Sequence, residues 1–166
     1  MRADLHIHTT ASDGSWSVDK LIQELASAGI GLFSVTDHDS IANVAAAGGL
    51  AKQAGLSFIP GVEICTTLKG QSFHILGYGI DPEAKALAQI LEHNTSLMEE
   101  VDHASIKKLI ADGLAIDYDE YCSYRHDPSR GCFHIMQPKI TITAQPGAKL
   151  LLGKRPGHTV HLLKLG

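Results

Sequence analysis

His6-Ile7-His8-Thr9-Thr10-Ala11-Ser12-Asp13-Gly14 lies near the start of this 166-residue chain and joins two histidines to a carboxylate and a glycine. The segment predicts the end of a β-strand over residues 2–8 and then a turn, which Gly14 allows because glycine adopts conformations closed to other residues. Side chains alternate along a strand, so His6 and His8 project from one face. Two imidazoles at this spacing can bind one zinc, iron, nickel or manganese ion. The alternative is a strand with two half-buried, hydrogen-bonded histidines.

Strands and helices are expected to alternate beyond this segment, because short apolar runs alternate with stretches of helical spacing. Ser17 is a suitable N-cap for the first helix and Gly29 a suitable stop. The expected elements are a strand over 2–8, a helix over 18–26, a strand over 31–36, a helix from Ser40 to about Gly55 and a strand over 56–64. Strand ends that recur every ~25 to 30 residues indicate βαβ units with parallel strands.

The strand ends carry metal-competent side chains. His6 and His8 end the first expected strand, His38 follows the second, and Glu63 lies near the end of the third. Ligand sites in parallel α/β folds lie at the carboxyl ends of strands, so these four side chains are expected to meet at one rim. The alternative for His38 is a helix-cap residue. A carboxylate within an apolar strand, such as Glu63, needs a partner.

Three neighbouring residues are expected to have supporting roles. Asp37 and Asp39 are interpreted as groups that orient the ligands or cap a helix, rather than as ligands themselves. Cys65 shares a face with Glu63 and is interpreted as a packing residue, because most such cysteines are small buried hydrophobes.

A hairpin and a long helix are expected next. An alternating run over 62–80 is broken at Lys69-Gly70, which is typical of a β-hairpin. Its second arm carries His74, either a metal ligand or a core histidine. The pattern then becomes helical from Asp81, a suitable N-cap, to about Asp112.

Composition favours one globular domain, with 44% hydrophobic and 19% charged residues. No stretch approaches the ~20 apolar residues of a membrane span, and the chain enters a strand without a signal peptide. The three cysteines have no paired spacing, so neither a disulfide framework nor a thiolate zinc site is indicated. A cytoplasmic location is therefore expected, without membrane contact. A net charge of −4 gives no reason to expect nonspecific binding of duplex DNA.

The chain is expected to divide near residue 131. Residues 1–131 form a metal-binding domain, in which 81–131 is a helical insertion or arm. This part holds all eighteen acidic residues and nine basic ones, whereas residues 132–166 hold five basic residues and no acidic one. The tail keeps no helical or strand period for more than a few residues. We interpret it as an atypical basic appendage, or as a segment not native to the fold.

Four motifs together resemble the PHP domain (polymerase and histidinol phosphatase) family, in its stand-alone metal-dependent phosphoesterase form. They are His-x-His at 6–8, Thr36-Asp37-His38-Asp39, Gly61-Val62-Glu63-Ile64 and His74-Ile75-Leu76-Gly77-Tyr78. The match is close over residues 1–80 and looser to about 131. The resemblance implies an α/β fold, a distorted TIM-like (β/α)7 barrel that holds two or three divalent ions (manganese, iron or zinc) at its carboxyl rim.

The resemblance also assigns roles within the metal centre. His6 and His8 are similar to ligands of one ion, and Asp13 and His38 to ligands of another. Glu63 is similar to a carboxylate that bridges two ions. The remaining member, His74, resembles a ligand of an ion that this carboxylate also touches. Glu63, His38 and Asp13 are thereby implied to be catalytic.

The implied activity is hydrolysis of a phosphate ester by a metal-activated hydroxide. The substrate would be a nucleotide, a small phosphate monoester or an oligonucleotide end. Arg125 or Arg130 is expected to clasp the substrate phosphate, although each is otherwise a surface arginine.

The later family motifs are absent. The family pattern requires a further histidine and a late Asp-x-His pair, yet no aspartate follows residue 131. The barrel is therefore expected to be incomplete, with an exposed edge through which the chain forms oligomers. Two alternatives to the phosphoesterase follow: a truncated, catalytically incomplete metal-binding remnant, or an exonuclease-type module that acts with a polymerase.

Overall fold

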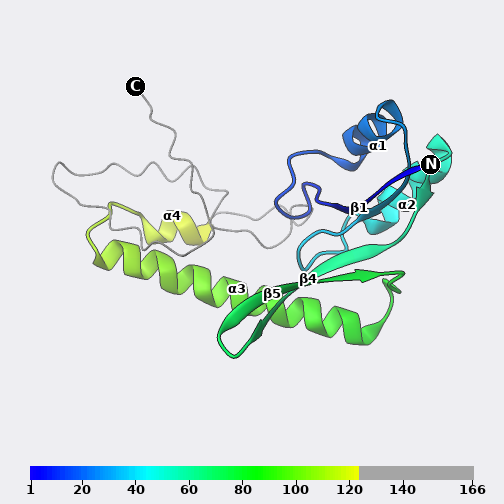
Figure 1. Cartoon of the computed structure of the whole chain (residues 1–166). Coiled ribbons are helices and arrows are strands. Elements are labelled where there is room, and N and C mark those ends of the chain that lie inside the picture. The colour runs from blue at the N-terminus through cyan, green and yellow to red at the C-terminus, as the bar shows by residue number, and fades with distance from the viewer. Residues whose placement is uncertain (124–166) are drawn as a thin grey trace, which may run out of the picture.

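A computed structural model describes residues 1–123, which form three parallel strands, a β-hairpin and four helices (Figure 1). The α/β class expected from the sequence is confirmed in this part of the chain. The strands within it do not close into a barrel. The expectations for Arg125, Arg130 and the tail over 132–166 lie outside the described residues.

The parallel sheet has the order β1 (Arg2–Ile7), β2 (Ile30–Val35) and β3 (Ser57–Phe58). Helices α1 (Val18–Ser27) and α2 (Val44–Ala54) connect these strands, as the expected βαβ units require.

The helix ends follow local capping chemistry. The hydroxyl of Ser17 accepts the Lys20 N–H at the start of α1, as predicted. The prediction that α2 begins at Ser40 is wrong, because that hydroxyl accepts the Ala42 N–H in a turn and the helix starts after Asn43. Gly55 ends α2 in the left-handed conformation, with φ of 69°.

The hydrophobic core lies on one face of the parallel sheet. Helices α1 and α2 both pack on this face, against Phe33 and Val35 of β2. The ring of Phe33 is fully buried and lies 5.0 Å from that of Phe58. The buried members from the two helices are Val18, Leu21, Ile22, Leu25, Ala47 and Ala51. Burial of each large aliphatic side chain contributes roughly 1.5–3 kcal/mol, so this face carries much of the apolar stabilisation of the sheet.

The strand predicted over 56–64 is wrong as a single element. It breaks at Pro60, which has no N–H for a strand ladder, and β4 (Gly61–Leu68) then pairs antiparallel with β5 (Gln71–Tyr78). The predicted turn at Lys69 and Gly70 is confirmed, with φ values of 52° and 76°. Two positive φ angles make this a turn suited to a two-residue hairpin.

The hairpin forms a second sheet, which an isolated bridge joins to the loop after β2. The Glu63 N–H donates to the carbonyl of Asp37 over 3.1 Å, and the Asp39 N–H donates to the carbonyl of Glu63 over 2.8 Å. These two bonds form a parallel bridge between His38 and Glu63. The bridge aligns the end of β2 with the start of the hairpin, and so places their side chains at one rim.

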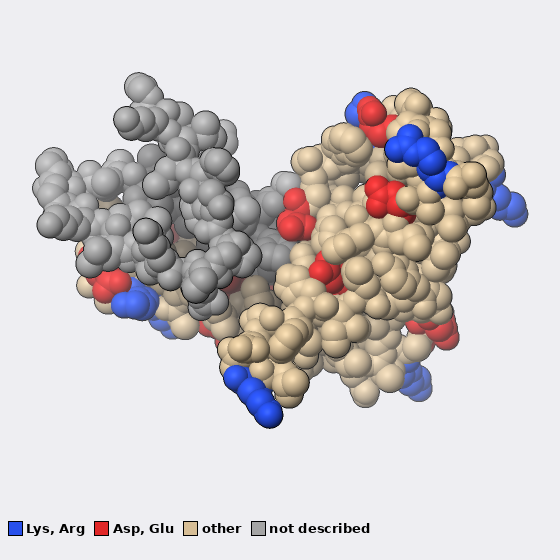
Figure 2. Space-filling view, in the orientation of Figure 1, with Lys and Arg blue, Asp and Glu red and all other residues tan. Residues whose placement is uncertain are grey.

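Helix α3 (Lys85–Ala111) runs along the hairpin, and α4 (Tyr118–Ser123) follows it (Figure 1). The prediction that Asp81 caps α3 is wrong, because its carboxylate accepts the Glu83 N–H in a preceding turn and the helix starts after Ala84. The predicted end near Asp112 is confirmed. Within residues 1–123, no helix has the length and apolar character needed to cross a membrane. On the face shown in Figure 2, lysine and arginine side chains of the described residues are scattered rather than gathered in one patch.

Two glycines provide a matched test of this packing. A Cβ at Gly61 would press on the hydroxyl of Ser34 and lie 2.9 Å from Val35 O and Thr36 Cγ2, whereas a Cβ at Gly49 on α2 meets nothing within 4 Å. We expect Gly61→Ala to lower the free energy of unfolding by about 1–3 kcal/mol through overpacking. Gly49→Ala should raise it by about 0.5–1 kcal/mol, because alanine loses less backbone entropy in a helix. Urea denaturation measures both, and an unchanged value for Gly61→Ala would contradict the close approach of β4 to β2.

Candidate metal centre

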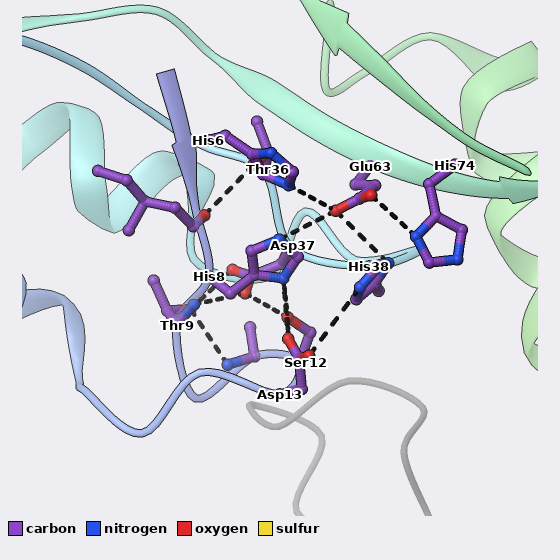
Figure 3. A network of polar contacts seen from close by, with 12 residues as sticks. His6, His8, Thr9, Ser12, Asp13, Thr36, Asp37, His38, Glu63 and His74 are labelled. Atoms are coloured by element: carbon purple, nitrogen blue, oxygen red, sulfur yellow. Dashed lines mark hydrogen bonds and ion pairs between the residues drawn. The ribbon is translucent and has the colours of Figure 1, made fainter. Parts of the chain in front are cut away.

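The carboxylate of Glu63 lies at the centre of a cluster of four imidazoles (Figure 3). Its side chain is only 5% exposed. One oxygen, Oε2, lies 2.9 Å from Nε2 of His6 and 2.9 Å from Nε2 of His8. The other oxygen, Oε1, lies 3.0 Å from Nδ1 of His74, and Nδ1 of His38 lies 3.6 Å from Oε2. A single buried carboxylate thus contacts imidazoles on both of its sides.

Asp13 forms a second carboxylate position at the mouth of the cluster. Its Oδ1 lies 2.8 Å from Nδ1 of His8, and its Oδ2 lies 4.0 Å from Nε2 of His38. The Asp13 side chain is 45% exposed, in contrast to that of Glu63. His8 and His38 therefore present one ring nitrogen toward each carboxylate.

Within residues 1–123, three overlapping sets of donor atoms could each hold a metal ion. Within each set the nitrogen, oxygen or sulfur donors lie within 4.8 Å of one another. Imidazole nitrogen and carboxylate oxygen suit zinc, iron and manganese, so the donor set fits the divalent ions expected from the sequence. The sets are His6, His8 and Glu63; His8, Asp13 and His38; and His38, Cys65 and His74.

The strand geometry brings these donors together. His6 lies within β1 and His8 just after it, on the face opposite the helical core. The parallel bridge aligns His38 with Glu63, and the antiparallel register of the hairpin pairs Cys65 with His74. Residues far apart in sequence thus reach one rim through backbone pairing.

Asp37 fixes the loop that carries His8 and Asp13. It is buried, and its carboxylate accepts the Thr9 N–H over 2.7 Å, the Thr9 hydroxyl over 2.6 Å and the Ser12 hydroxyl over 2.6 Å. Leaving such buried donors unpaired would cost roughly 1–3 kcal/mol, so the loop conformation depends on this aspartate. In the structure Asp37 therefore orients the loop of the cluster, in the supporting role expected of it.

Asp39 and Asn94 hold the other side of the cluster. The Oδ1 atom of Asp39 accepts the Cys65 N–H over 3.2 Å and an N–H from the Asn94 amide over 2.6 Å. The same amide donates to the carbonyl of Cys65 over 2.8 Å. Asp39 adopts a φ of 45°, which non-glycine residues rarely adopt, so these bonds stabilise an unusual backbone. Helix α3, which carries Asn94, is thereby tied to the rim.

The surroundings shift the pKa of two site residues. Burial raises the pKa of Glu63, but the hydrogen bond from His6 and the charges of His38, His6 and His8 outweigh it, so the net shift is downward. Burial lowers the pKa of His38, and the neighbouring carboxylates only partly oppose this. Both pKa shifts are in the direction that favours the forms able to bind a metal ion, an ionised carboxylate and a neutral imidazole.

The structure brings together six of the residues singled out in the sequence: His6, His8, Asp13, His38, Glu63 and His74. Their roles as ligands stay predictions. Cys65, interpreted as a packing residue, also lies among them, and its shared face with Glu63 is the signal that could have placed it there. Asn94 carries no such signal, because its position follows from how α3 packs rather than from a local motif.

Comparison with known proteins agrees with this arrangement. The model of the PHP domain family matches residues 4–143. The chain belongs to the PHP domain family. The family implied by the four motifs is thus confirmed.

Two curated relatives of this PHP chain are an exoribonuclease and a nucleoside bisphosphate phosphatase. It is 34% identical over 116 residues to a 5'-3' exoribonuclease of Haemophilus influenzae, which covers 70% of this chain and 42% of the relative. It is 38% identical over 85 residues to a 3',5'-nucleoside bisphosphate phosphatase of Chromobacterium violaceum, which covers 51% of this chain and 30% of the relative. The chain spans less than half the length of these curated relatives.

Solved structures share the fold. An amidohydrolase from Chromobacterium violaceum with bound sulfate has a TM-score of 0.63 and 32% identity, covering 78% of this PHP chain and 46% of the other. A proposed metal-dependent phosphoesterase from Bifidobacterium adolescentis has a TM-score of 0.68 at 21% identity, covering 81% and 48%. The second likeness supports the fold alone.

Replacement of His8 tests whether the cluster binds metal. We expect His8→Ala to weaken metal binding by at least ~100-fold, because even the outer partners of metal ligands contribute about 10–100-fold. The stability of the metal-free protein should change by less than about 1 kcal/mol, because the helical core lies on the other face of the sheet. Metal content by plasma mass spectrometry and thermal unfolding of the metal-free protein measure the two effects.

The exposed His93 on α3 provides the control. His93→Ala should leave both metal content and stability unchanged. Full metal content in His8→Ala together with a large loss of stability would instead identify His8 as a structural histidine.

Proposed function

We propose that this PHP chain is a metal-dependent phosphoesterase that hydrolyses a phosphate ester of a nucleotide or of an RNA end. One observation carries the proposal: the buried carboxylate of Glu63 lies between imidazoles that approach both of its oxygens. The partners of this carboxylate are imidazoles, which can themselves bind metal ions, whereas the structural carboxylate of Asp37 is bonded by a backbone N–H and by hydroxyl groups. A carboxylate with donors on both sides suits a bridge between two cations about 3.5–4 Å apart, whose mutual repulsion it reduces.

The residues of the rim would hold two or three ions. His6 and His8 would bind one ion through the nitrogens that face Oε2 of Glu63, and His74 would bind another beside Oε1. Asp13 would add a carboxylate ligand beside His38, in the set of His8, Asp13 and His38. When bound, such ions lower the pKa of a water molecule, hold phosphate oxygens and stabilise the leaving oxygen.

Exposure indicates where a substrate would enter. The side chains of His6, His74 and Asp13 are 51%, 50% and 45% exposed, whereas that of Glu63 is buried beneath them. A substrate phosphate would therefore approach from the side of the exposed ligands and leave Glu63 out of contact with water. Arg125 or Arg130 is proposed to bind a non-reacting phosphate oxygen.

The substrate class follows from the relatives. An exoribonuclease and a nucleoside bisphosphate phosphatase share the phosphate ester of a ribonucleotide as the bond acted on. The solved relative from Chromobacterium violaceum holds sulfate, which matches phosphate in shape and in the oxygen atoms it presents. These similarities support a phosphate ester as the substrate, and two of the relatives favour the ester of a nucleotide or of RNA.

A second candidate is a metal-binding domain without catalysis. The donor count within residues 1–123 favours it, because the three candidate sets share His8 and His38. A neutral imidazole has one lone pair and serves one ion at a time, so the described residues alone cannot fill all three positions.

Hydrolysis assays decide between the two candidates. The purified chain, loaded with manganese, iron or zinc, is offered a nucleoside 3',5'-bisphosphate, a 5'-phosphorylated RNA oligonucleotide and p-nitrophenyl phosphate. We expect phosphate or nucleotide release from at least one ribonucleotide substrate, and a loss of at least ~100-fold in Glu63→Gln, which keeps the shape and removes the charge. The exposed Glu92 on α3 gives the matched control, Glu92→Gln, which should keep full activity. A chain that binds metal but releases nothing from any substrate would contradict the phosphoesterase and support the second candidate.

A further inference from the structure

We propose that Cys65, as a thiolate, is a ligand of the ion that would bind beside His74 and Oε1 of Glu63. This metal position would then combine nitrogen, sulfur and oxygen ligands. The inference rests on the proposed metal-dependent function and specifies the chemistry of one of its ions. Nothing in the cysteine spacing of the sequence indicates such a site, because it is built from a single cysteine and residues distant in sequence.

The donor atoms of this set lie close together. The sulfur of Cys65 lies 3.6 Å from Nδ1 of His38, and both lie within 4.8 Å of a ring nitrogen of His74. A packing cysteine is expected among apolar side chains, yet the neighbours of this sulfur are two imidazoles of the rim.

Backbone pairing, rather than chance side-chain contact, creates this arrangement. Cys65 follows Glu63 by two residues on β4, so both side chains project from one face. The hairpin register places Cys65 directly opposite His74 on β5, and the parallel bridge brings His38 alongside. The side chains of directly opposed residues in an antiparallel pair are neighbours, so Cys65 and His74 can reach one ion without a change of backbone.

The backbone N–H and C=O groups of Cys65 both form hydrogen bonds with side chains. Its N–H donates to the carboxylate of Asp39, and its carbonyl accepts an N–H from Asn94. These bonds come from the loop after β2 and from α3, so two elements besides β4 itself hold the backbone that carries the sulfur. Such support is typical of side chains whose orientation matters to a bound ion.

The spacing of sulfur and nitrogen matches coordination of one ion. Zinc binds thiolate sulfur at about 2.3 Å and imidazole nitrogen at about 2.0–2.1 Å, so a tetrahedral angle separates the two ligand atoms by roughly 3.6 Å. The observed separation between Cys65 Sγ and His38 Nδ1 is 3.6 Å. A hydrogen bond between a thiol and an imidazole has a similar length, and the spectrum of the cobalt-loaded protein distinguishes such a bond from metal coordination.

Two donor sets can be filled at the same time only if Cys65 takes part. The set of His6, His8 and Glu63 shares no residue with the set of His38, Cys65 and His74. The remaining set, His8, Asp13 and His38, shares His8 with the first of these sets and His38 with the second. With Cys65 as a ligand, two ions can each keep three donors of their own among the described residues, while Oε1 of Glu63 faces the second ion beside His74.

A thiolate ligand changes which metal this position prefers. Binding displaces the thiol proton to solvent, and the resulting soft sulfur favours zinc or ferrous iron over manganese and magnesium. Cys65 would therefore make one position of the centre selective, while the position of His6 and His8 stays accessible to any of the divalent ions.

Cobalt substitution tests the proposal directly, because cobalt(II) replaces zinc and reports thiolate ligands through a sulfur-to-metal charge-transfer band in the near ultraviolet. The double variant Cys122→Ser/Cys132→Ser leaves Cys65 as the sole cysteine of the chain. We expect this variant to show both the visible bands of bound cobalt and the charge-transfer band. Adding Cys65→Ser should remove the charge-transfer band, keep visible bands and lower the affinity for zinc by about tenfold or more, with little change for manganese.

Each other outcome is informative. Visible cobalt bands without the charge-transfer band in the Cys65-only variant would overturn the thiolate ligand and leave the proposed metal-dependent function standing. The absence of any cobalt spectrum in wild type would overturn both. The Cys65-only variant decides the question even if Cys65→Ser fails to fold, because its spectrum needs no substitution at the site.

Discussion

The arrangement of the rim depends on one constraint: the buried carboxylate of Glu63 needs hydrogen-bonding or charged partners. Glu63 is almost fully removed from water, and an isolated ionised carboxylate in such surroundings is strongly unfavourable. Four imidazoles from three segments of the chain meet this need: two from the end of β1, one from the loop after β2 and one from β5. Because those partners lie up to 57 residues away in sequence, the fold has to bring the strand ends together before the carboxylate is satisfied.

The two faces of the parallel sheet have different roles, which makes this cluster of polar side chains possible. One face packs against α1 and α2 and carries most of the apolar burial, so the opposite face is free to hold polar side chains. Those side chains are oriented by a surrounding layer of hydrogen bonds, in which Asp37 holds the His8 loop and Asp39 with Asn94 holds Cys65. A centre that must keep several cations apart by a fixed distance benefits from ligands that cannot drift, and this layer supplies that rigidity.

Much of this arrangement could be predicted from the sequence, because it follows from the hydrophobic periodicity of the chain and from the positions of histidines at the ends of apolar runs. The His-x-His pair and His38 lie at the ends of apolar runs, and the parallel order of β1 and β2 places them at one rim. Glu63 lies near the start of β4 and joins them through its bridge to His38. The break at Pro60 could not be foreseen from apolar content, because a continuous apolar run conceals the change from β3 to β4. Cys65 could have been placed from the strand face that it shares with Glu63, whereas the place of Asn94 depends on how α3 packs, a tertiary property that local sequence does not encode.

The central claim is that Glu63 joins two ions, and electron paramagnetic resonance of the cobalt-loaded chain tests it most directly. Two cobalt(II) ions held about 3.5–4 Å apart by a shared carboxylate are magnetically coupled, which weakens the ordinary signal relative to the amount of metal bound. We expect this weakened signal in wild type at two ions per chain, and the full signal of separate ions in Glu63→Gln. A full, uncoupled signal from wild type at the same loading would contradict it.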